Sequence, residues 1–374
     1  MFFLSKYLLL NKKLNLFNPK KTDVLFFGKP NLNLNFKNKI KHFELHNQLY
    51  LQIFLKSFLK HIFLEKENIK SIYFKELMKK LDPKIVVGDE INENIFKFKK
   101  NFPKKKAICY QIVNWSNMHK THLKKNFLIK DKKCDYFLLF NKNHKKYFKH
   151  IKAKFVNIGS FKNNFKPLKK KKFIYDILFI SEYRPTILQK LYYKDKMTLS
   201  IKKNYNYFTT IVLEAIKELI IEKKLKLAIA LSSSRSEKKI QNYKKKEVSF
   251  FKNTVQNFPT YRQDAYSLIE KSKVVVSTWS TLGVEIYAQK KKIMFITPRF
   301  LKNFNWSFYP RAEGLNWYQG INKEKIKDKI MYLYSLNEKK WRRIYNKNNF
   351  GLEFDLGNKK FMKIIYKELN INAK

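Results

Sequence analysis

Small hydroxyl side chains follow an apolar run in the segment 274–288, which carries the strongest chemical signal in the sequence. Three valines lead into Ser277 and Thr278, and Ser280 and Thr281 come directly before residues with helical spacing. Serine and threonine favour the first position of a helix, where backbone amides and the helix dipole attract anions. The segment therefore predicts a phosphate site at a junction between a strand and a helix.

Glu285 lies one turn inside the same predicted helix. Its carboxylate could accept hydrogen bonds from ribose or sugar hydroxyls. In the alternative interpretation, the hydroxyl side chains only cap the helix and Glu285 lies on its solvated face.

Arginine is rare in this chain and is therefore informative. Only seven of the 81 basic residues are Arg, and five of these fall between residues 184 and 311. Unlike Lys, Arg binds phosphate or carboxylate through two parallel hydrogen bonds. Arg184 closely follows one apolar run, and Ser232 and Arg235 follow another. We predict phosphate contacts at these positions; a salt bridge for Arg184 and an ordinary loop for the serines are the alternatives.

The formal net charge of +52 would by itself suggest a nucleic-acid partner. The excess comes from Lys, however, in a chain that is also crowded with Asn, Ile, Phe and Tyr. Codons for all five are rich in adenine and thymine, so genome bias explains the charge more simply than function does. We predict no nucleic-acid partner, although a basic surface still attracts anionic lipid at about 1 kcal/mol per nearby Lys or Arg.

The sequence predicts no metal site and no cofactor. Cys109 and Cys134 lie in apolar runs without metal-ligand spacing, which is typical of buried thiols in a reducing compartment. No apolar stretch reaches the roughly 18 residues of a membrane span, and the first residues lack a cleavage site. We expect a cytoplasmic protein that could lie at the inner face of the plasma membrane.

Short apolar runs alternate with helical patterns, which is typical of βαβ units. In the first half, strands are expected at residues 23–27, 85–87, 107–113, 136–140 and 154–158, and helices at 46–64, 69–81 and 143–150. In the second half, strands are expected at 175–180, 227–231, 274–277 and 293–296, and helices at 207–222, 262–271, 282–289, 323–335, 338–345 and 359–369.

A stretch with Pro167 and five lysines between residues 165 and 172 predicts a linker. We expect one domain at residues 1–165, a second at 173–350, and a C-terminal helix within 351–374 that could pack back on the first domain. The predicted fold class is α/β, with two Rossmann-like domains whose parallel sheets face each other across a cleft. Ligands of such sheets bind beyond the carboxyl ends of the strands.

Candidate catalytic residues follow strands of the first domain. Asp89 and Glu90 come after the predicted strand 85–87, and His119 follows the strand 107–113. Any of them could act as a general base. Further residues are expected to line the cleft, with ordinary turn or scaffolding roles as the alternative: Gly159, Ser160, Asn164, Arg311 and Glu313.

Several segments resemble known families when taken together in order. The segment 274–288 resembles the strand, serine and helix element of GT-B glycosyltransferases. The stretches 136–142, 151–164 and 175–184 resemble a family of bacterial surface carbohydrate biosynthesis proteins. The resemblance covers roughly residues 80–345. One departure is that the family's Gln-Asn-Gly type turn appears here around Gln111 and Asn114 without its Gly.

The resemblance implies a GT-B-like fold, a nucleotide diphosphate resting on the helix start, and Glu285 on the ribose. It implies transfer of a sugar from a nucleotide-activated donor, bound by the second domain, to a glycan or lipid-linked acceptor on the side of the first. The product would be surface polysaccharide, such as O-antigen or capsule. A glycerophosphotransferase or a sugar epimerase on the same fold is the alternative, and a non-enzymatic nucleic-acid-binding protein is the second.

Overall fold

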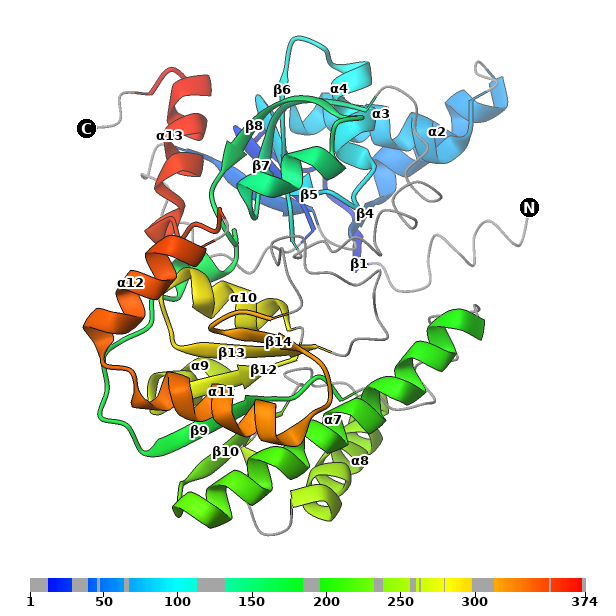
Figure 1. Cartoon of the computed structure of the whole chain (residues 1–374). Coiled ribbons are helices and arrows are strands. Elements are labelled where there is room, and N and C mark those ends of the chain that lie inside the picture. The colour runs from blue at the N-terminus through cyan, green and yellow to red at the C-terminus, as the bar shows by residue number, and fades with distance from the viewer. Residues whose placement is uncertain are drawn as a thin grey trace. The chain divides into compact units, whose positions relative to one another are not determined.

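The chain forms two compact units, one of residues up to 112 with 132–166 and 355–371, the other of residues within 167–354 (Figure 1). This is a computed structural model. It describes residues 13–28, 40–45, 48–63, 67–112, 132–183, 196–231, 238–255, 260–261, 264–278, 280–297, 313–349 and 351–371.

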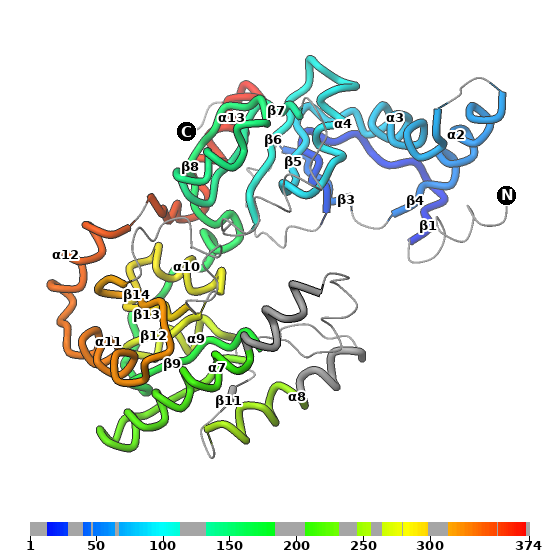
Figure 2. The backbone as a smooth tube through the Cα atoms, turned by 45° about the vertical axis from the view of Figure 1, so that its right-hand side comes forward, coloured from blue at the N-terminus to red at the C-terminus, as the bar shows by residue number. Residues whose placement is uncertain are grey.

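A six-stranded, all-parallel sheet forms the centre of the first unit. Its strands lie in the order β3 (His42–Leu45), β2 (Val24–Phe27), β5 (Ile85–Asp89), β6 (Lys106–Tyr110), β7 (Lys133–Leu139) and β8 (Lys152–Asn157). A separate parallel pair, β1 (Lys13–Asn15) and β4 (Gln48–Tyr50), lies beside α2 (Figure 2). The helical segments of this unit are α2 (Leu51–Phe63), α3 (Ile69–Leu81), α4 (Asn94–Asn101), η1 (Lys142–Tyr147), η2 (Asn163–Phe165), η4 (Leu356–Asn358) and α13 (Lys359–Glu368).

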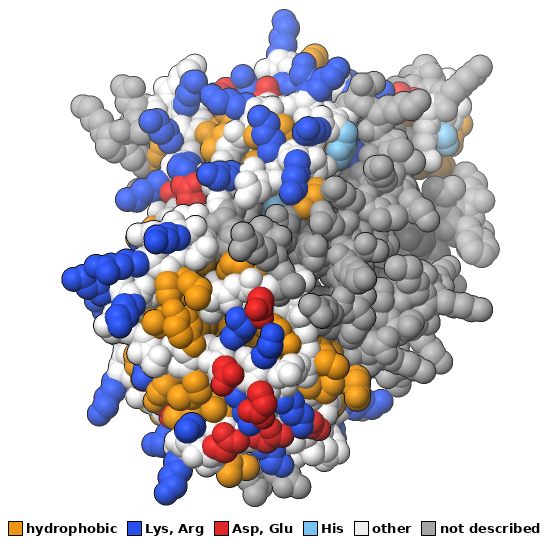
Figure 3. Space-filling model, in the orientation of Figure 1, with side chains coloured by type: hydrophobic (Ala, Val, Ile, Leu, Met, Phe, Trp, Pro, Cys, Tyr) orange, Lys and Arg blue, Asp and Glu red, His pale blue; other side chains and the backbone are white. Residues whose placement is uncertain are grey.

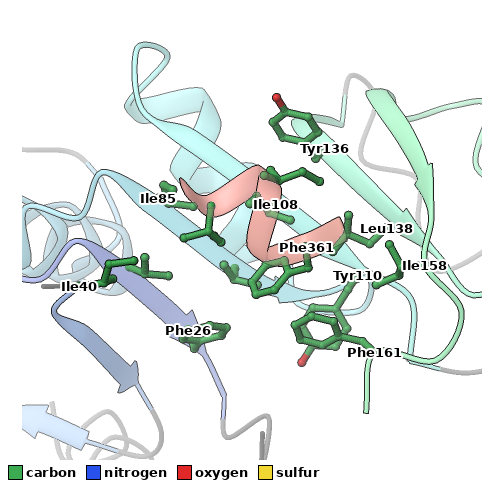
Figure 4. Close-up of a cluster of buried hydrophobic side chains, with 14 residues drawn as sticks. Phe26, Ile40, Ile85, Ile108, Tyr110, Tyr136, Leu138, Ile158, Phe161 and Phe361 are labelled. Atoms are coloured by element: carbon green, nitrogen blue, oxygen red, sulfur yellow. The ribbon is translucent and has the colours of Figure 1, made fainter. Parts of the chain in front are cut away.

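Alternating side chains of this sheet pack on the C-terminal helix (Figure 4). Phe361 and Ile365 of α13 are fully buried in a cluster with Val87, Ile108 and Leu138 from three neighbouring strands. The opposite face of the sheet carries α4, which contacts β5, β6 and β7. The period of two along each strand sends alternate side chains to the two faces, and both faces are covered, as is usual for parallel sheets.

The second unit repeats this architecture around its own parallel sheet. The strands lie in the order β11 (Thr260–Tyr261), β10 (Leu227–Ala230), β9 (Tyr175–Ile180), β12 (Ser272–Ser277), β13 (Ile293–Thr297) and β14 (Trp317–Gln319). Its helices are α7 (Lys196–Lys223), α8 (Lys238–Val255), α9 (Ala265–Glu270), α10 (Thr281–Ala288), α11 (Lys323–Ser335) and α12 (Glu338–Asn348).

The predicted fold class is confirmed: the chain is an α/β protein with two Rossmann-like parallel sheets. Several boundaries differ from the prediction. The strand expected at 107–113 ends at Tyr110, the helix expected at 143–150 is the 3-10 segment η1, and α7 begins well before residue 207. The helix α4 was not predicted. No helix in the described ranges is long and apolar enough to cross a membrane.

Candidate functional site

The strand order of the second unit defines where a ligand would bind. Along the chain β9 comes first, and the next strands β10 and β11 lie on one side of it while β12, β13 and β14 lie on the other. The chain therefore reverses direction between β9 and β12, and open α/β sheets bind ligands at the carboxyl edge of that point. Ile180 pairs with Ser277 there, so Ser181 and Thr278 leave the sheet side by side.

Helix α10 begins at this edge, and three residues separate it from the end of β12. Ser280 is its N-cap, in an extended conformation, but its side chain makes no capping hydrogen bond. The first hydrogen bond of the helix runs from the amide of Val284 to the carbonyl of Ser280. Within the described ranges the amides of Thr281, Leu282 and Gly283 donate to no backbone carbonyl outside α10, and the Ser280 side chain does not cap them. Such amides, at the positive end of the helix dipole, form an anion site.

Gly283 holds the start of α10 close to β12. A Cβ atom at this position would lie 2.6 Å from the Oγ atom of Ser277 and 2.9 Å from its Cβ. Ser277 and Thr278 are fully buried, and Ser277 Oγ has no hydrogen-bond partner among the described residues. Burial favours a packing role for Ser277, whereas Ser280 and Thr281 are partly exposed. The phosphate roles of all four residues stay predictions.

The buried carboxylate of Glu247 contacts the residue that follows β9. The hydroxyl of Ser181 donates to Oε1 of Glu247 in α8 at 2.5 Å, and Glu247 is fully buried. The same hydroxyl accepts from the amide of Tyr183 at 3.2 Å. These contacts hold the residues that lead toward Arg184. Sequence reasoning missed Glu247, because a single acidic residue in a Lys-rich helix gives no signal of burial.

Glu285 is half-buried on α10 and contacts α9. The hydroxyl of Tyr266 donates to Oε2 of Glu285 at 3.4 Å. Burial and the nearby negative charge of Glu285 raise the pKa of Tyr266, so this hydroxyl keeps its proton. The contact fixes the position of the carboxylate that the sequence assigned to a ribose or sugar hydroxyl.

Several predicted site residues lie outside the described residues: Arg184, Ser232, Arg235, Arg311 and His119. Glu313 lies within the described residues. Its backbone forms an antiparallel β-bridge with Tyr318, on the outer side of the edge strand β14. Its carboxylate lies 3.9 Å from the ammonium group of Lys325. No described interaction joins Glu313 to the start of α10.

Asp89 and Glu90 lie at the carboxyl edge of the first sheet, in different environments. Asp89 is half-buried, and burial raises the pKa of its carboxyl, although the amides of Ile91 and Asn92 oppose this shift. Glu90 is almost completely buried and accepts from the amide of Ile112 at 2.8 Å. Asp89 is therefore the more accessible of the two carboxylates, while Glu90 ties the ends of β5 and β6 together.

Gly28 directly follows β2 and lies beside Asp89. It was not among the site residues predicted from the sequence. It has a φ of 95°, a conformation that favours glycine. The pairing of Phe26 with Val87, continued by two residues, brings Gly28 level with Asp89. β3 lies on one side of β2 and β5 on the other, so this is the switch point of the first sheet. A glycine directly after a strand in a chain with eight glycines was the available signal.

A polar network lies beneath the ends of β6 and β7. Oε1 of Gln111 accepts from the amide of Phe140 at 3.0 Å, so its Nε2 group donates to Nδ1 of His144 at 2.7 Å. His144 is fully buried, and burial together with the charge of Lys146 lowers the pKa of its imidazole to about 3. Burial thus keeps His144 neutral, and the contact with Gln111 selects one tautomer.

The predicted turn residues after β8 mainly bond within their own unit. Gly159 has a φ of 77°, and Ser160 Oγ accepts from the amide of Asn163. Asn164 is fully buried; its Nδ2 donates to the carbonyl of Ile158 and to Oδ1 of Asn358, at 2.8 and 2.7 Å. Its Oδ1 accepts from the amide of Asp355 at 3.1 Å. These contacts favour a scaffolding role for Asn164 over a role in lining the cleft.

In the described part of the chain, no group of three or more His, Cys, Asp or Glu side chains could hold a metal ion. Both cysteines are buried, and burial raises the pKa of each thiol, that of Cys134 to about 12.

Two parallel Rossmann-like sheets in one chain define the class of the protein, and solved structures share this fold. A Listeria monocytogenes protein named as a UDP-N-acetylglucosamine 2-epimerase matches with a TM-score of 0.56 and 11% identity, over 94% of this chain and 97% of its own. MnaA of S. aureus bound to UDP matches with a TM-score of 0.52 and 13% identity, over 95% and 98%. A trehalose-6-phosphate synthase matches with a TM-score of 0.50 and 11% identity, over 92% and 93%.

A family model described as an O-antigen biosynthesis protein matches residues 120–369, which is well over half of the chain. The chain belongs to this family. The predicted membership in a surface carbohydrate family and the predicted GT-B-like fold are therefore confirmed. No curated protein matches the chain.

Proposed function

We propose that the protein is an enzyme that transfers a sugar from a nucleotide-activated donor to a glycan or lipid-linked acceptor during synthesis of surface polysaccharide. The single observation that carries the proposal is the start of α10. Three amides that donate to no backbone carbonyl outside α10 in the described ranges point out of a helix at the switch point of the second sheet. A diphosphate is the anion that fits such a helix start. Membership in the O-antigen family supplies the biological context.

The donor site in this proposal combines described and undescribed residues. The α10 amides bind one phosphate, and Glu285 accepts hydrogen bonds from ribose hydroxyls. Described acidic side chains here, such as Glu285 and Glu247, cannot neutralise a diphosphate, so we assign that task to Arg184 and Arg235. UDP bound to S. aureus MnaA, a protein of the same fold, supports a nucleoside diphosphate as the ligand class.

Thr281→Pro tests the helix start, because proline at the first helical position removes one amide donor without breaking the helix. Ser280 has φ −64° and ψ 134°, which suits the residue before a proline. We expect the affinity for the bound nucleoside diphosphate to fall about tenfold in calorimetric titration with UDP, GDP and dTDP. Glu338→Pro, at the matching position of α12 after the extended Asn337, is the control and should bind as the parent does.

The outcome that rejects the donor site is absence of binding to any nucleoside diphosphate by the parent protein. Equal affinity of the parent and Thr281→Pro would reject the role of the α10 amides. Arg184→Ala and Glu285→Ala extend the test in single-turnover assays, where unchanged rates in both variants would contradict the assigned contacts.

Asp89 is our proposed general base for the acceptor hydroxyl. Its raised pKa makes it a stronger base than an ordinary Asp. Asp89→Asn should lower the single-turnover transfer rate about a hundredfold or more while leaving nucleotide affinity unchanged. A variant with the parental rate would exclude Asp89 as the base.

A sugar epimerase is the second candidate, because one of the solved structures that share this fold is of a protein named as a UDP-N-acetylglucosamine 2-epimerase. The two activities differ in one requirement. An epimerase converts a nucleotide sugar without an acceptor, and proton NMR of the nucleotide sugar incubated with the protein alone would detect the new epimer. A transferase leaves the sugar configuration of the unreacted donor unchanged.

A further inference from the structure

An exposed apolar surface lies on α2 and on the segment after β1, in the first unit. We call it the α2 surface, and its members are Leu16, Phe17, Leu55, Leu59, Ile62 and Phe63. Phe17 is 83% exposed and Phe63 73%. Single exposed apolar side chains are normal, but a gathered set indicates an interaction site.

The four members from α2 lie on one face of the helix. Their spacing of four, seven and eight residues from Leu55 forms a single stripe. The residues Ile53 and Ser57 on another face are buried, and α2 packs there on α3.

The other two members reach the same surface from the segment after β1. β1 pairs with β4, which leads directly into α2 (Figures 1 and 2). Nδ2 of Asn18 donates to Oε1 of Gln52 at 2.6 Å, which joins this segment to the first turn of α2.

The two described segments that form the α2 surface carry basic side chains and no acidic ones. The described stretches 13–22 and 48–63 contain five lysines and neither Asp nor Glu. Lys21 and Lys56 are 81% and 63% exposed. The nearby carboxylate of Glu76 lies within 4 Å of three ammonium groups, those of Lys56, Lys60 and Lys79, at 2.9, 3.0 and 3.7 Å, so positive charge is in excess there. Lys and Arg side chains are also spread widely over the face drawn in Figure 3.

We propose that the α2 surface docks on the anionic face of a lipid bilayer. The apolar stripe enters the boundary between headgroups and acyl chains, and the lysines contact lipid phosphates. At 13 residues, α2 is shorter than the roughly 20 residues that a span requires. It therefore lies in the plane of the interface. This inference goes beyond the proposed sugar transfer and does not depend on it.

A second copy of the chain is the competing occupant, and charge disfavours it. In a two-fold contact the same surface faces itself, so the excess positive charge of one copy would meet that of the other. An anionic bilayer neutralises the same lysines.

Vesicle co-sedimentation tests the proposal with variants that have the same net charge as the parent. Leu59→Gln with Ile62→Gln removes two apolar side chains from the α2 surface and leaves the net charge unchanged. Ile221→Gln with Leu356→Gln is the matched control, since these side chains are 65% and 48% exposed elsewhere. The probes are phosphatidylcholine vesicles with and without about 30% phosphatidylglycerol, a content that gives a negative surface potential.

We expect the parent and the control to partition onto the anionic vesicles and the α2 variant to partition about tenfold less. Equal binding of the α2 variant and the control would overturn the proposal, as would absence of binding by the parent. A parental dimer in analytical ultracentrifugation that the α2 variant converts to monomer would assign the surface to a second copy instead. Nucleotide titration of the α2 variant separates this result from the donor site, because its affinity should equal that of the parent.

Discussion

The hydroxyl of Ser181 donates to the carboxylate of Glu247 across 2.5 Å, and this pair joins the end of β9 to α8. Both side chains are buried. A short bond to a carboxylate in such a place is stronger than a neutral one. It holds the end of β9 at the switch point of the second sheet.

A double-mutant cycle measures this contact. Ser181→Ala, Glu247→Gln and the double variant should give a coupling free energy of about 1.5–3 kcal/mol in urea unfolding, as for hydrogen bonds to charged groups. The cycle cancels the other interactions of Glu247. A coupling near zero would mean that the two side chains contribute independently.

Gly283→Ala should weaken the packing of α10 on β12. The new methyl group would lie 2.6 Å from Ser277 Oγ and 3.2 Å from Cδ1 of Ile293, so the helix start must shift. We expect a loss of about 1–3 kcal/mol in the free energy of unfolding together with weaker nucleotide binding. Ser277→Gly in the same chain removes the nearest atoms and should restore part of both; no effect of Gly283→Ala would contradict the packing role.

The sequence predicted the parts of this edge that depend on local pattern. The apolar run before Ser277 indicated β12, and the hydroxyl residues Ser280 and Thr281 indicated the start of α10. These are short-range signals, because strand and helix periodicity and capping preferences act within a few residues. The match of strand 175–180 to β9 has the same origin.

Long-range contacts could not be predicted in this way. Glu247 meets Ser181 across 66 positions, and Gln111 meets His144 across 33. Asn164 was expected in a cleft but is bonded to the C-terminal segment, 194 residues away at Asn358. Which side chain a polar residue meets is decided by strand order and helix packing, and one sequence carries no direct record of either.

Asn164→Ala should destabilise the first unit. The substitution leaves Asn358 Oδ1, the carbonyl of Ile158 and the amide of Asp355 without the partner described here. Unpaired buried groups cost about 1–3 kcal/mol each, so we expect a total loss of about 3 kcal/mol or more in urea unfolding. Asn68→Ala, which removes a single exposed cap bond to Lys70, is the reference and should cost about 1 kcal/mol. Equal losses would contradict the bridging role, while nucleotide affinity should not change.

His144 makes the stability of the first unit dependent on pH. Burial, followed by the charge of Lys146, lowers the pKa of its imidazole to about 3, against an ordinary value of 6.5. Above about pH 6.5 the imidazole is neutral in both the folded and the unfolded chain, so its contribution is fully present. Between pH 6.5 and pH 3 the imidazole is protonated in the unfolded chain but stays neutral in the folded chain. Acidification therefore favours unfolding, by as much as about 1.4 kcal/mol per pH unit.

His144→Gln isolates this effect, because glutamine does not titrate and its carbonyl can still accept from Nε2 of Gln111. Urea unfolding at pH 7 and pH 5 should give the parent an extra loss of about 2 kcal/mol relative to the variant, since the unfolded imidazole is mostly protonated at pH 5. Carboxylate titrations common to both proteins cancel in this difference. Parallel pH profiles would mean that His144 is not held neutral by burial, and the neutral tautomer that we assign to the Gln111 contact would then be wrong.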